Sequence, residues 1–187
     1  MKRRAALRRI SRLSGLSGTI GSALLWASGT AHAALPAPYN PLVLQPAGGP
    51  DRFEFDLTAA LAQARRERKR LYVYLGASDC PFCRRYEAFL ARNAEALVPQ
   101  FNQHNYLVVD LRSSLSATAT KLFIRIGASS LVYADFQRSI GDERARLLVY
   151  PSVWLLDAQA KPLMQMPAGT GTFETVAEQL EILRLEQ

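Results

Sequence analysis

The chain has 187 residues, of which 49% are hydrophobic and 21% charged, a composition typical of a globular protein. Its formal net charge of +7 comes from 23 lysine and arginine residues against 16 aspartate and glutamate residues. Six of the basic residues and none of the acidic ones precede residue 34, so the remainder carries 17 basic and 16 acidic residues, a net charge of +1. This near-neutral balance argues against a nucleic-acid-binding or membrane-surface protein.

The first 33 residues have the composition of an export signal. A basic start that includes Arg3-Arg4 is followed by a moderately apolar stretch over 16–27 and by Ala31-His32-Ala33, a small-x-small cleavage pattern. We expect cleavage after Ala33, a periplasmic location and no permanent membrane anchor, because the apolar stretch is shorter than the roughly 20 residues of a spanning helix. Both the general secretory route and the twin-arginine route stay open.

Residues 34–52 predict an extended leader. This segment contains five prolines and the pair Gly48-Gly49, and both residue types interrupt regular structure. About 154 residues remain after cleavage, which is enough for one hydrophobic core. We therefore expect a single folded domain over 53–187.

The first half of that domain alternates helical and strand patterns. Asp56 is a candidate N-cap for a helix whose apolar residues recur every three or four positions over 57–64. The almost wholly apolar run 71–75 predicts a strand buried on both faces. A second strand, over 106–111, follows an intervening helix and should lie beside the first and parallel to it.

The intervening helix is expected to begin near Pro81 and to end at Pro99, because proline interrupts a helix interior. Its apolar residues keep helical spacing and predict one buried stripe. Its charged residues, assigned to the solvent face, are Arg84, Arg85, Glu87 and Arg92.

The second half of the domain is less regular. Helical patterns over 119–126 and 130–140 predict a helical insertion. Residues 152–156 and 162–166 predict an antiparallel hairpin, and Thr172 is the candidate N-cap of a last helix. The expected fold class is α/β, a central mixed sheet with a C-terminal antiparallel hairpin and helices on both faces.

The chemistry of the chain is concentrated in Cys80-Pro81-Phe82-Cys83, which holds its only two cysteines and follows the strand predicted over 71–75. A cysteine in the first turn of a helix faces unpaired backbone N–H groups and the positive end of the helix dipole, and both favour the thiolate. Two thiols at this spacing can open to a dithiol or close to a disulfide. We therefore expect thiol:disulfide exchange without any metal or cofactor beyond a redox-active Cys80–Cys83 disulfide.

Within this motif, Cys80 is the expected attacking thiol and should be exposed at the helix N-terminus. Cys83 lies one turn further in and is the expected resolving thiol, which attacks the mixed disulfide and releases the partner. Pro81 and Phe82, between the cysteines, are candidate contacts for the substrate.

The dithiol after the first central strand, together with Pro151 at the start of the hairpin about 70 residues later, resembles the thioredoxin superfamily, and its exported members in particular. The resemblance extends from about residue 53 to the C-terminus and is carried by residues 71–84 and 149–157. It implies the thioredoxin fold and a cis peptide bond before Pro151. It also implies that Tyr150 and Pro151 face the dithiol, where an extended substrate can pair with the free backbone.

Three features depart from thioredoxin. The position six residues before Cys80, where thioredoxin has a buried aspartate that helps to move a proton at the second cysteine, is Tyr74. A phenol is a poor general base at neutral pH, so the usual carboxylate role is unassigned. The bulky Tyr150 is expected to narrow access to the dithiol. The segment over 112–148 is longer than a minimal thioredoxin needs, and such insertions often select partners.

The expected function is that of an extracytoplasmic thiol:disulfide oxidoreductase that reduces exported proteins containing disulfides or cysteines and receives electrons from a membrane donor. An oxidase of the same fold, which introduces disulfides, is the alternative. Exchange potentials in this superfamily span about 150 mV, so small electrostatic differences reverse the direction of electron flow.

Two other classes of function stay open. A copper chaperone would use the two cysteines, with His104 as the one histidine left after cleavage, although we expect His104 to be solvated. A binding module would keep Cys80 and Cys83 as a fixed disulfide, but such a short loop adds little stability.

Overall fold

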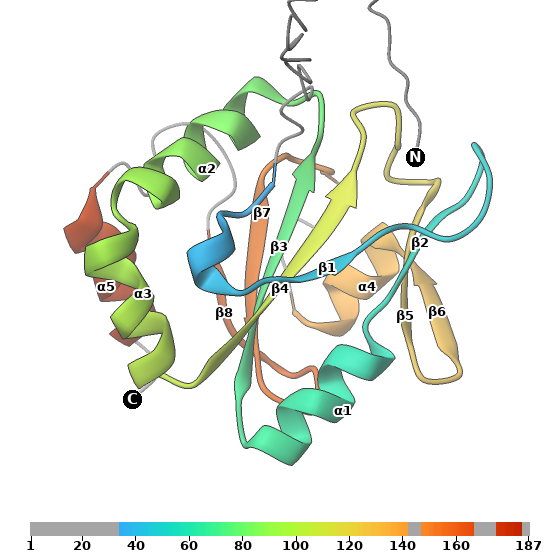
Figure 1. Cartoon of the computed structure of the whole chain (residues 1–187). Helices are drawn as coiled ribbons and strands as arrows, with labels where there is room; N and C mark the ends of the chain where they lie inside the picture. Colours follow the sequence, from blue (N-terminus) through green and yellow to red (C-terminus); the bar gives the residue numbers. More distant parts are fainter. Residues whose placement is uncertain (1–33, 142–146, 167–174, 185–187) are drawn as a thin grey trace, which may run out of the picture. The chain divides into compact units, whose positions relative to one another are not determined.

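The computed structural model describes residues 34–141, 147–166 and 175–184, which belong to one compact unit (Figure 1). Its centre is a five-stranded sheet in the order β1-β4-β3-β7-β8. The strands of this sheet are β1 (Leu42–Leu44), β3 (Arg70–Ala77), β4 (Tyr106–Ser113), β7 (Ser152–Leu156) and β8 (Pro162–Met166). β3 pairs parallel with β4 and antiparallel with β7, and β7 pairs antiparallel with β8. The mixed α/β class expected from the sequence is confirmed.

Helices cover both faces of this sheet (Figure 1). They are α1 (Thr58–Glu67), α2 (Pro81–Arg92), α3 (Ala94–Gln103), α4 (Tyr133–Ser139) and α5 (Val176–Arg184), with a short 3-10 helix η1 (Ala37–Tyr39). Tyr72 and Tyr74 of β3 point to the face of α2, α3 and α5, whereas Leu71, Val73 and Leu75 point to the face of α1 and α4. Among the described residues, none of the helices is both long and apolar enough to cross a membrane.

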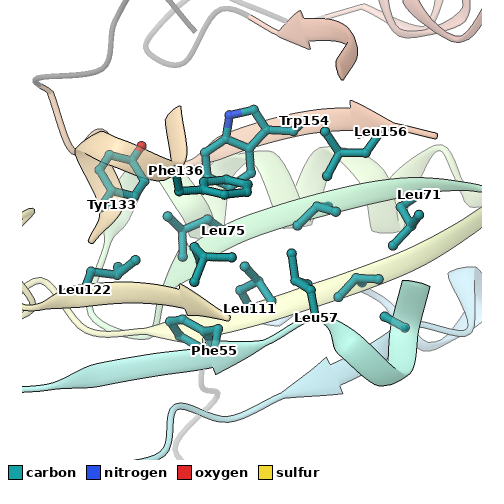
Figure 2. Packing of buried hydrophobic residues seen from close by; sticks show 14 of the residues in the cluster. Phe55, Leu57, Leu71, Leu75, Leu111, Leu122, Tyr133, Phe136, Trp154 and Leu156 are labelled. Atoms are coloured by element: carbon teal, nitrogen blue, oxygen red, sulfur yellow. The ribbon is translucent and has the colours of Figure 1, made fainter. Parts of the chain in front are cut away.

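The core between the sheet and α4 is built around Trp154 (Figure 2). Its indole ring lies edge-on to Phe136, at a centroid distance of 5.4 Å, and 6.1 Å from the ring of Tyr133. Leu75 and Leu111 of the parallel strands complete the cluster from the sheet side. Aromatic pairs of this kind add about 0.5–1.5 kcal/mol each beyond their area burial, so this cluster ties the chain before β7 to the sheet.

Residues 34–52 do not form the leader that the sequence predicted. Leu42–Leu44 is β1, an edge strand that pairs parallel with β4. Leu35 and Tyr39 are buried, and the Tyr39 hydroxyl donates to the carbonyl oxygen of Leu90 at 3.0 Å. The prolines break this segment into short pieces but leave the apolar run of β1 free to cover the edge of β4, so the folded unit begins before residue 53.

The helix predicted to end at Pro99 is in fact two helices, and that prediction was wrong. α2 ends at Arg92, and α3 contains Pro99 in its interior. The interruption lies at Asn93, which is both the C-cap of α2 and the N-cap of α3 and has a non-helical backbone, with φ −110° and ψ 17°; its side-chain Nδ2 donates to the carbonyl oxygen of Phe89 at 2.8 Å. Because Asn93 satisfies this carbonyl locally, α2 ends without a proline.

The segment before the last two strands contains β structure where a helix was predicted over 119–126. That stretch contains β5 (Leu122–Ile126), which pairs parallel with β2 (Phe53–Asp56) and antiparallel with β6 (Ser129–Val132) in a separate three-stranded sheet. Leu122 and Ile124 are buried on alternate positions, the period of a strand. The helix predicted over 130–140 is present only as α4, so the insertion is a hairpin followed by one short helix.

The last helix, α5, has a reciprocal cap at its N-terminus. The backbone N–H of Glu178 donates to the hydroxyl of Thr175 at 3.2 Å, and the backbone N–H of Thr175 donates to Oε2 of Glu178 at 3.1 Å. The predicted cap, Thr172, lies outside the described residues. α5 packs on α2 through Tyr86, which donates to Oε1 of Gln179 at 2.8 Å.

Candidate active site

Cys80 is the N-cap residue of α2. Its backbone is extended, with φ −87° and ψ 119°, and its Sγ accepts a hydrogen bond from the backbone N–H of Cys83 at 3.1 Å. Pro81 occupies the first helical position, where a missing N–H costs no intrahelical hydrogen bond. The sulfur of Cys80 therefore occupies the place of a capping oxygen, at the positive end of the helix, as the sequence predicted.

Both cysteines are free thiols and both are buried. Cys80 is 2% exposed, so the prediction of an exposed attacking thiol was wrong. The chain before β7 lies against the sulfur, because the thiol of Cys80 donates to the carbonyl oxygen of Tyr150 at 3.8 Å. The exposed members of the motif are Pro81 and Phe82, and the Phe82 side chain is 44% exposed.

The peptide bond between Tyr150 and Pro151 is cis. The carbonyl of Tyr150 faces Cys80, and its side chain is buried, with the hydroxyl donating to Oγ of Ser113 at 3.0 Å. Burial raises the pKa of Tyr150, and the nearby Cys83 adds to this effect. The structure thus brings the Tyr150–Pro151 pair and the two cysteines together, although they are far apart in the sequence.

Cys83 lies deeper than Cys80 and has no exposed surface. Its Sγ accepts a weak hydrogen bond from the backbone N–H of Ala77, at the end of β3, at 3.5 Å. Burial is the main reason that the pKa of Cys83 lies well above its ordinary value, and the neighbouring Cys80 raises it further. At neutral pH this thiol therefore holds its proton until another group accepts it.

A buried carboxylate close to Cys83 was missed by the sequence analysis, which assigned Glu87 to the solvent face. Glu87 is 7% exposed, and its Oε1 accepts a hydrogen bond from the hydroxyl of Tyr74 at 2.7 Å. Burial raises the pKa of Glu87 and also that of Tyr74. The available signal was the spacing, since Glu87 follows Cys83 by four positions and so shares its side of α2.

A second buried carboxylate, Asp110 on β4, lies opposite Tyr74 in the parallel register and is 1% exposed. Its Oδ2 accepts from the backbone N–H of Leu35 and from Nε of Arg112, both at 3.1 Å. Burial raises the pKa of Asp110 despite these partners. Glu87 also accepts a hydrogen bond from the backbone of Ala34, so both carboxylates contact the first described residues.

His104 was expected to be solvated, but it is buried at the C-terminal end of α3. His104 is the C-cap residue of α3, and its backbone N–H donates to the carbonyl oxygen of Gln100 at 3.0 Å, so it ends a packed helix and does not lie in an open polar loop. Across the described ranges, no group of three or more histidine, cysteine, aspartate or glutamate side chains is arranged to hold a metal ion.

Comparison with known proteins identifies one family. A family model described as a thioredoxin-like domain matches residues 57–183. No curated protein matches the chain.

The solved structures that are similar to this chain at low identity include the following three. The first two thioredoxin domains of Eps1p from Saccharomyces cerevisiae are 14% identical with a TM-score of 0.38, and the match covers 74% of this chain but 41% of the yeast chain. The exposed lipoprotein thioredoxin Etrx1 of Streptococcus pneumoniae is 16% identical with a TM-score of 0.37, covering 66% of this chain and 87% of the other. A protein described as a thiol:disulfide interchange protein DsbE, from Chlorobium tepidum, is 16% identical with a TM-score of 0.37, covering 66% and 84%.

Proposed function

The chain belongs to the thioredoxin-like domain family, and from this premise we propose that it is an extracytoplasmic thiol:disulfide oxidoreductase with Cys80 as the attacking and Cys83 as the resolving thiol. One observation carries the proposal. The Sγ of Cys80 caps α2, where the backbone N–H of Cys83 donates to it at 3.1 Å. Positive helix-end charge and a direct N–H donor both stabilise a thiolate, which is the attacking species in disulfide exchange.

In the reducing direction, the thiolate of Cys80 attacks one sulfur of a substrate disulfide. An S–S bond forms between enzyme and substrate, the substrate disulfide breaks, and the first substrate sulfur leaves as a thiolate and takes up a proton. Cys83 then loses its proton and attacks Sγ of Cys80, which releases the second substrate sulfur. Two electrons pass from the dithiol to the substrate, and the enzyme is left with a Cys80–Cys83 disulfide.

The substrate site is proposed to lie between the motif and the cis proline. Phe82 offers an exposed apolar ring beside the dithiol, with the guanidinium of Arg85 5.7 Å from its centroid. Pro81 and Phe82 would contact the substrate from α2, and Tyr150 and Pro151 from the opposite side. Because Pro151 has no N–H, an extended peptide would pair with the backbone next to it rather than with the proline itself.

We assign the protein to reduction of exported proteins that contain disulfides or cysteines, with electrons supplied by a membrane donor. This assignment follows the resemblance to exported relatives and the export signal expected over 1–33, with cleavage after Ala33 and a periplasmic location. Disulfide introduction is the second candidate. A difference of roughly 30 mV in potential is worth about 1.4 kcal/mol for a two-electron couple, so a few local charges decide between the two directions.

Activity is tested with Cys80→Ser and Cys83→Ser in an assay that follows reduction of a protein disulfide by a small dithiol. Cys80→Ser should abolish turnover, and Cys83→Ser should accumulate a mixed disulfide with the substrate. Unchanged turnover in Cys80→Ser would overturn the enzyme assignment. If both variants lost stability instead of activity, the dithiol would be a structural disulfide.

Direction is tested separately, by the equilibrium potential of the dithiol in a glutathione buffer and by rapid thiol trapping in whole cells. A reductase should be held largely as the dithiol in growing cells. A fully oxidised pool would contradict reduction and favour the oxidase. A Cu(I) titration of the reduced protein addresses the copper chaperone, which tight binding would support.

A further inference from the structure

The proposed reaction requires a proton acceptor for Cys83. This thiol is fully buried, and burial raises its pKa, so it is not a thiolate at neutral pH without help. At the strand position where thioredoxin has an aspartate, this chain has Tyr74, whose phenol is a poor general base at neutral pH. The acceptor must therefore come from elsewhere in the fold.

The ring of Tyr74 lies along β3 toward the cysteine motif. A Cβ placed on Gly76, two residues further along the strand, would be 2.5 Å from Cε1 and 2.8 Å from the hydroxyl of Tyr74. The ring thus occupies the space next to the Cα atom of Gly76, where the side chain of any residue other than glycine would lie. The next residue, Ala77, donates its backbone N–H to Sγ of Cys83 at 3.5 Å, and the Tyr74 hydroxyl interacts with this thiol.

The same hydroxyl contacts Glu87. It donates to Oε1 of Glu87 at 2.7 Å, within the range of a strong hydrogen bond to a carboxylate. Cys83 and Glu87 are one turn apart on α2, and the Tyr74 hydroxyl from β3 lies against both. The three side chains form a continuous path from the thiol to a buried carboxylate.

We propose that Tyr74 and Glu87 form a relay that accepts the proton of the Cys83 thiol, with Glu87 as the final acceptor. The carboxylate that thioredoxin has on the strand is thus supplied in this chain by α2. This inference rests on the proposed function. As Cys83 attacks Sγ of Cys80, its proton passes to the oxygen of Tyr74, and the hydroxyl proton of Tyr74 passes to Oε1 of Glu87. Tyr74 stays neutral throughout, Glu87 becomes a carboxylic acid, and the departing substrate thiolate takes up a separate proton from solvent.

Burial suits Glu87 to this role, because it raises the pKa of its carboxyl toward that of a useful base. Asp110 raises the pKa further, whereas the Tyr74 hydroxyl, the Ala34 backbone N–H and Arg112 lower it. The groups facing Glu87 therefore come from β3, from β4 and from Ala34, the first described residue, and together they set the pH range over which Glu87 accepts a proton. A tyrosine alone would have to become a buried tyrosinate, and the raised pKa of Tyr74 opposes this.

The two half-reactions separate in a stopped-flow experiment with the aromatic disulfide 5,5′-dithiobis(2-nitrobenzoate). Attack by Cys80 releases one coloured thiolate and leaves the other in a mixed disulfide, and attack by Cys83 then releases the second. The first phase reports the proposed enzyme function, and the second reports the relay. Absence of a Cys80-dependent first phase would overturn the proposed function itself.

For the relay, Glu87→Gln and Tyr74→Phe should each slow the second phase about tenfold or more near neutral pH, without slowing the first. Both should also change the pH profile of the second phase, which a purely structural role of these residues would not do. Glu95→Gln, a substitution on the exposed side of α3, is the matched control and should leave both phases unchanged. A normal second phase with an unaltered pH profile in either Glu87→Gln or Tyr74→Phe would overturn the relay.

Discussion

The backbone N–H of Leu35 donates a hydrogen bond of 3.1 Å to Oδ2 of Asp110, and so joins the first described residues to the centre of β4. Asp110 is 1% exposed and forms an ion pair with Arg112, whose Nε is also 3.1 Å from Oδ2. A buried carboxylate is costly unless its oxygens are satisfied. The segment before residue 53 therefore stabilises a group in the middle of the sheet.

The first prediction concerns this segment. A chain that begins at Asp51 loses the Leu35 hydrogen bond, the pairing of β1 with β4 and the buried ring of Tyr39, which lies 5.1 Å from that of Phe101. We expect the free energy of unfolding to fall by at least about 3 kcal/mol. Urea unfolding against a chain that begins at Ala34 measures the difference, and equal midpoints would show that residues 34–50 are dispensable to the fold.

The second prediction concerns Gly76. Gly76→Ala places a methyl group 2.5 Å from the ring of Tyr74, so the ring must move. We expect a loss of about 1–3 kcal/mol in stability, typical of overpacking. Gly49→Ala is the control, because a Cβ there meets no atom within 4 Å and should change the thermal melting temperature little. An unchanged melting temperature in Gly76→Ala would mean that Tyr74 has another position available.

Local patterns predicted much of this structure. The apolar run of β3 and the strand of β4 were evident because each is buried on both faces, and their parallel pairing follows from the helices between them. The place of Cys80 at a helix N-terminus also followed from neighbouring residues, since Pro81 fits the first helical position. These features depend on short-range spacing, which a sequence shows directly.

The remaining features depend on distant partners. The burial of Cys80 comes from the chain at Tyr150, whose path no pattern near Cys80 could indicate. Glu87 was placed on the solvent face because its neighbours on that side are arginines, although it lies over Tyr74. The local pattern of β5 predicts a helix, and the partner that makes it a strand, β2, precedes it by about 70 residues. In each case, a tertiary contact outweighed the local signal.

The third prediction concerns access to Cys80. The hydroxyl of Tyr150 donates to Ser113 and the ring is buried beside the motif, so Tyr150→Ala should uncover the thiol and raise its alkylation rate several-fold. It should also cost about 3 kcal/mol in stability, as expected for removal of a buried ring. The rate is measured with iodoacetamide in a Cys83→Ala background, where Cys80 is the one remaining thiol.

Tyr150→Phe serves as the control for this prediction, because it keeps the ring and loses the hydrogen bond to Ser113. It should cost about 1 kcal/mol and leave the alkylation rate near that of the parent. Equal rates for Tyr150→Ala and the parent would show that Tyr150 does not limit access to the thiol.

The fourth prediction concerns the pH dependence of stability. Burial raises the pKa of both Glu87 and Asp110 above their values in the unfolded chain. Between the unfolded and the folded pKa values, the folded state binds more protons, so the free energy of unfolding falls as the pH rises from about 4. Glu87→Gln has no carboxyl to ionise and should reduce this fall, as measured by urea unfolding at a series of pH values.

Cleavage after Ala33 should alter the pH dependence of the free energy of unfolding. The Ala34 backbone hydrogen-bonds Glu87, so in a chain that begins at Ala34 a positively charged α-amino group takes the place of that peptide N–H. A cation there lowers the pKa of Glu87 and makes its ionisation less costly. We expect the fall in stability between about pH 4 and 7 to be smaller in this chain than in one extended by Gly-Ser before Ala34, in which the amino group lies further from the carboxylate.

Because the effect acts through one carboxylate, Glu87→Gln should remove the difference between the two chains, whereas Glu95→Gln should preserve it. A difference that persists in Glu87→Gln would place the response at Asp110 instead.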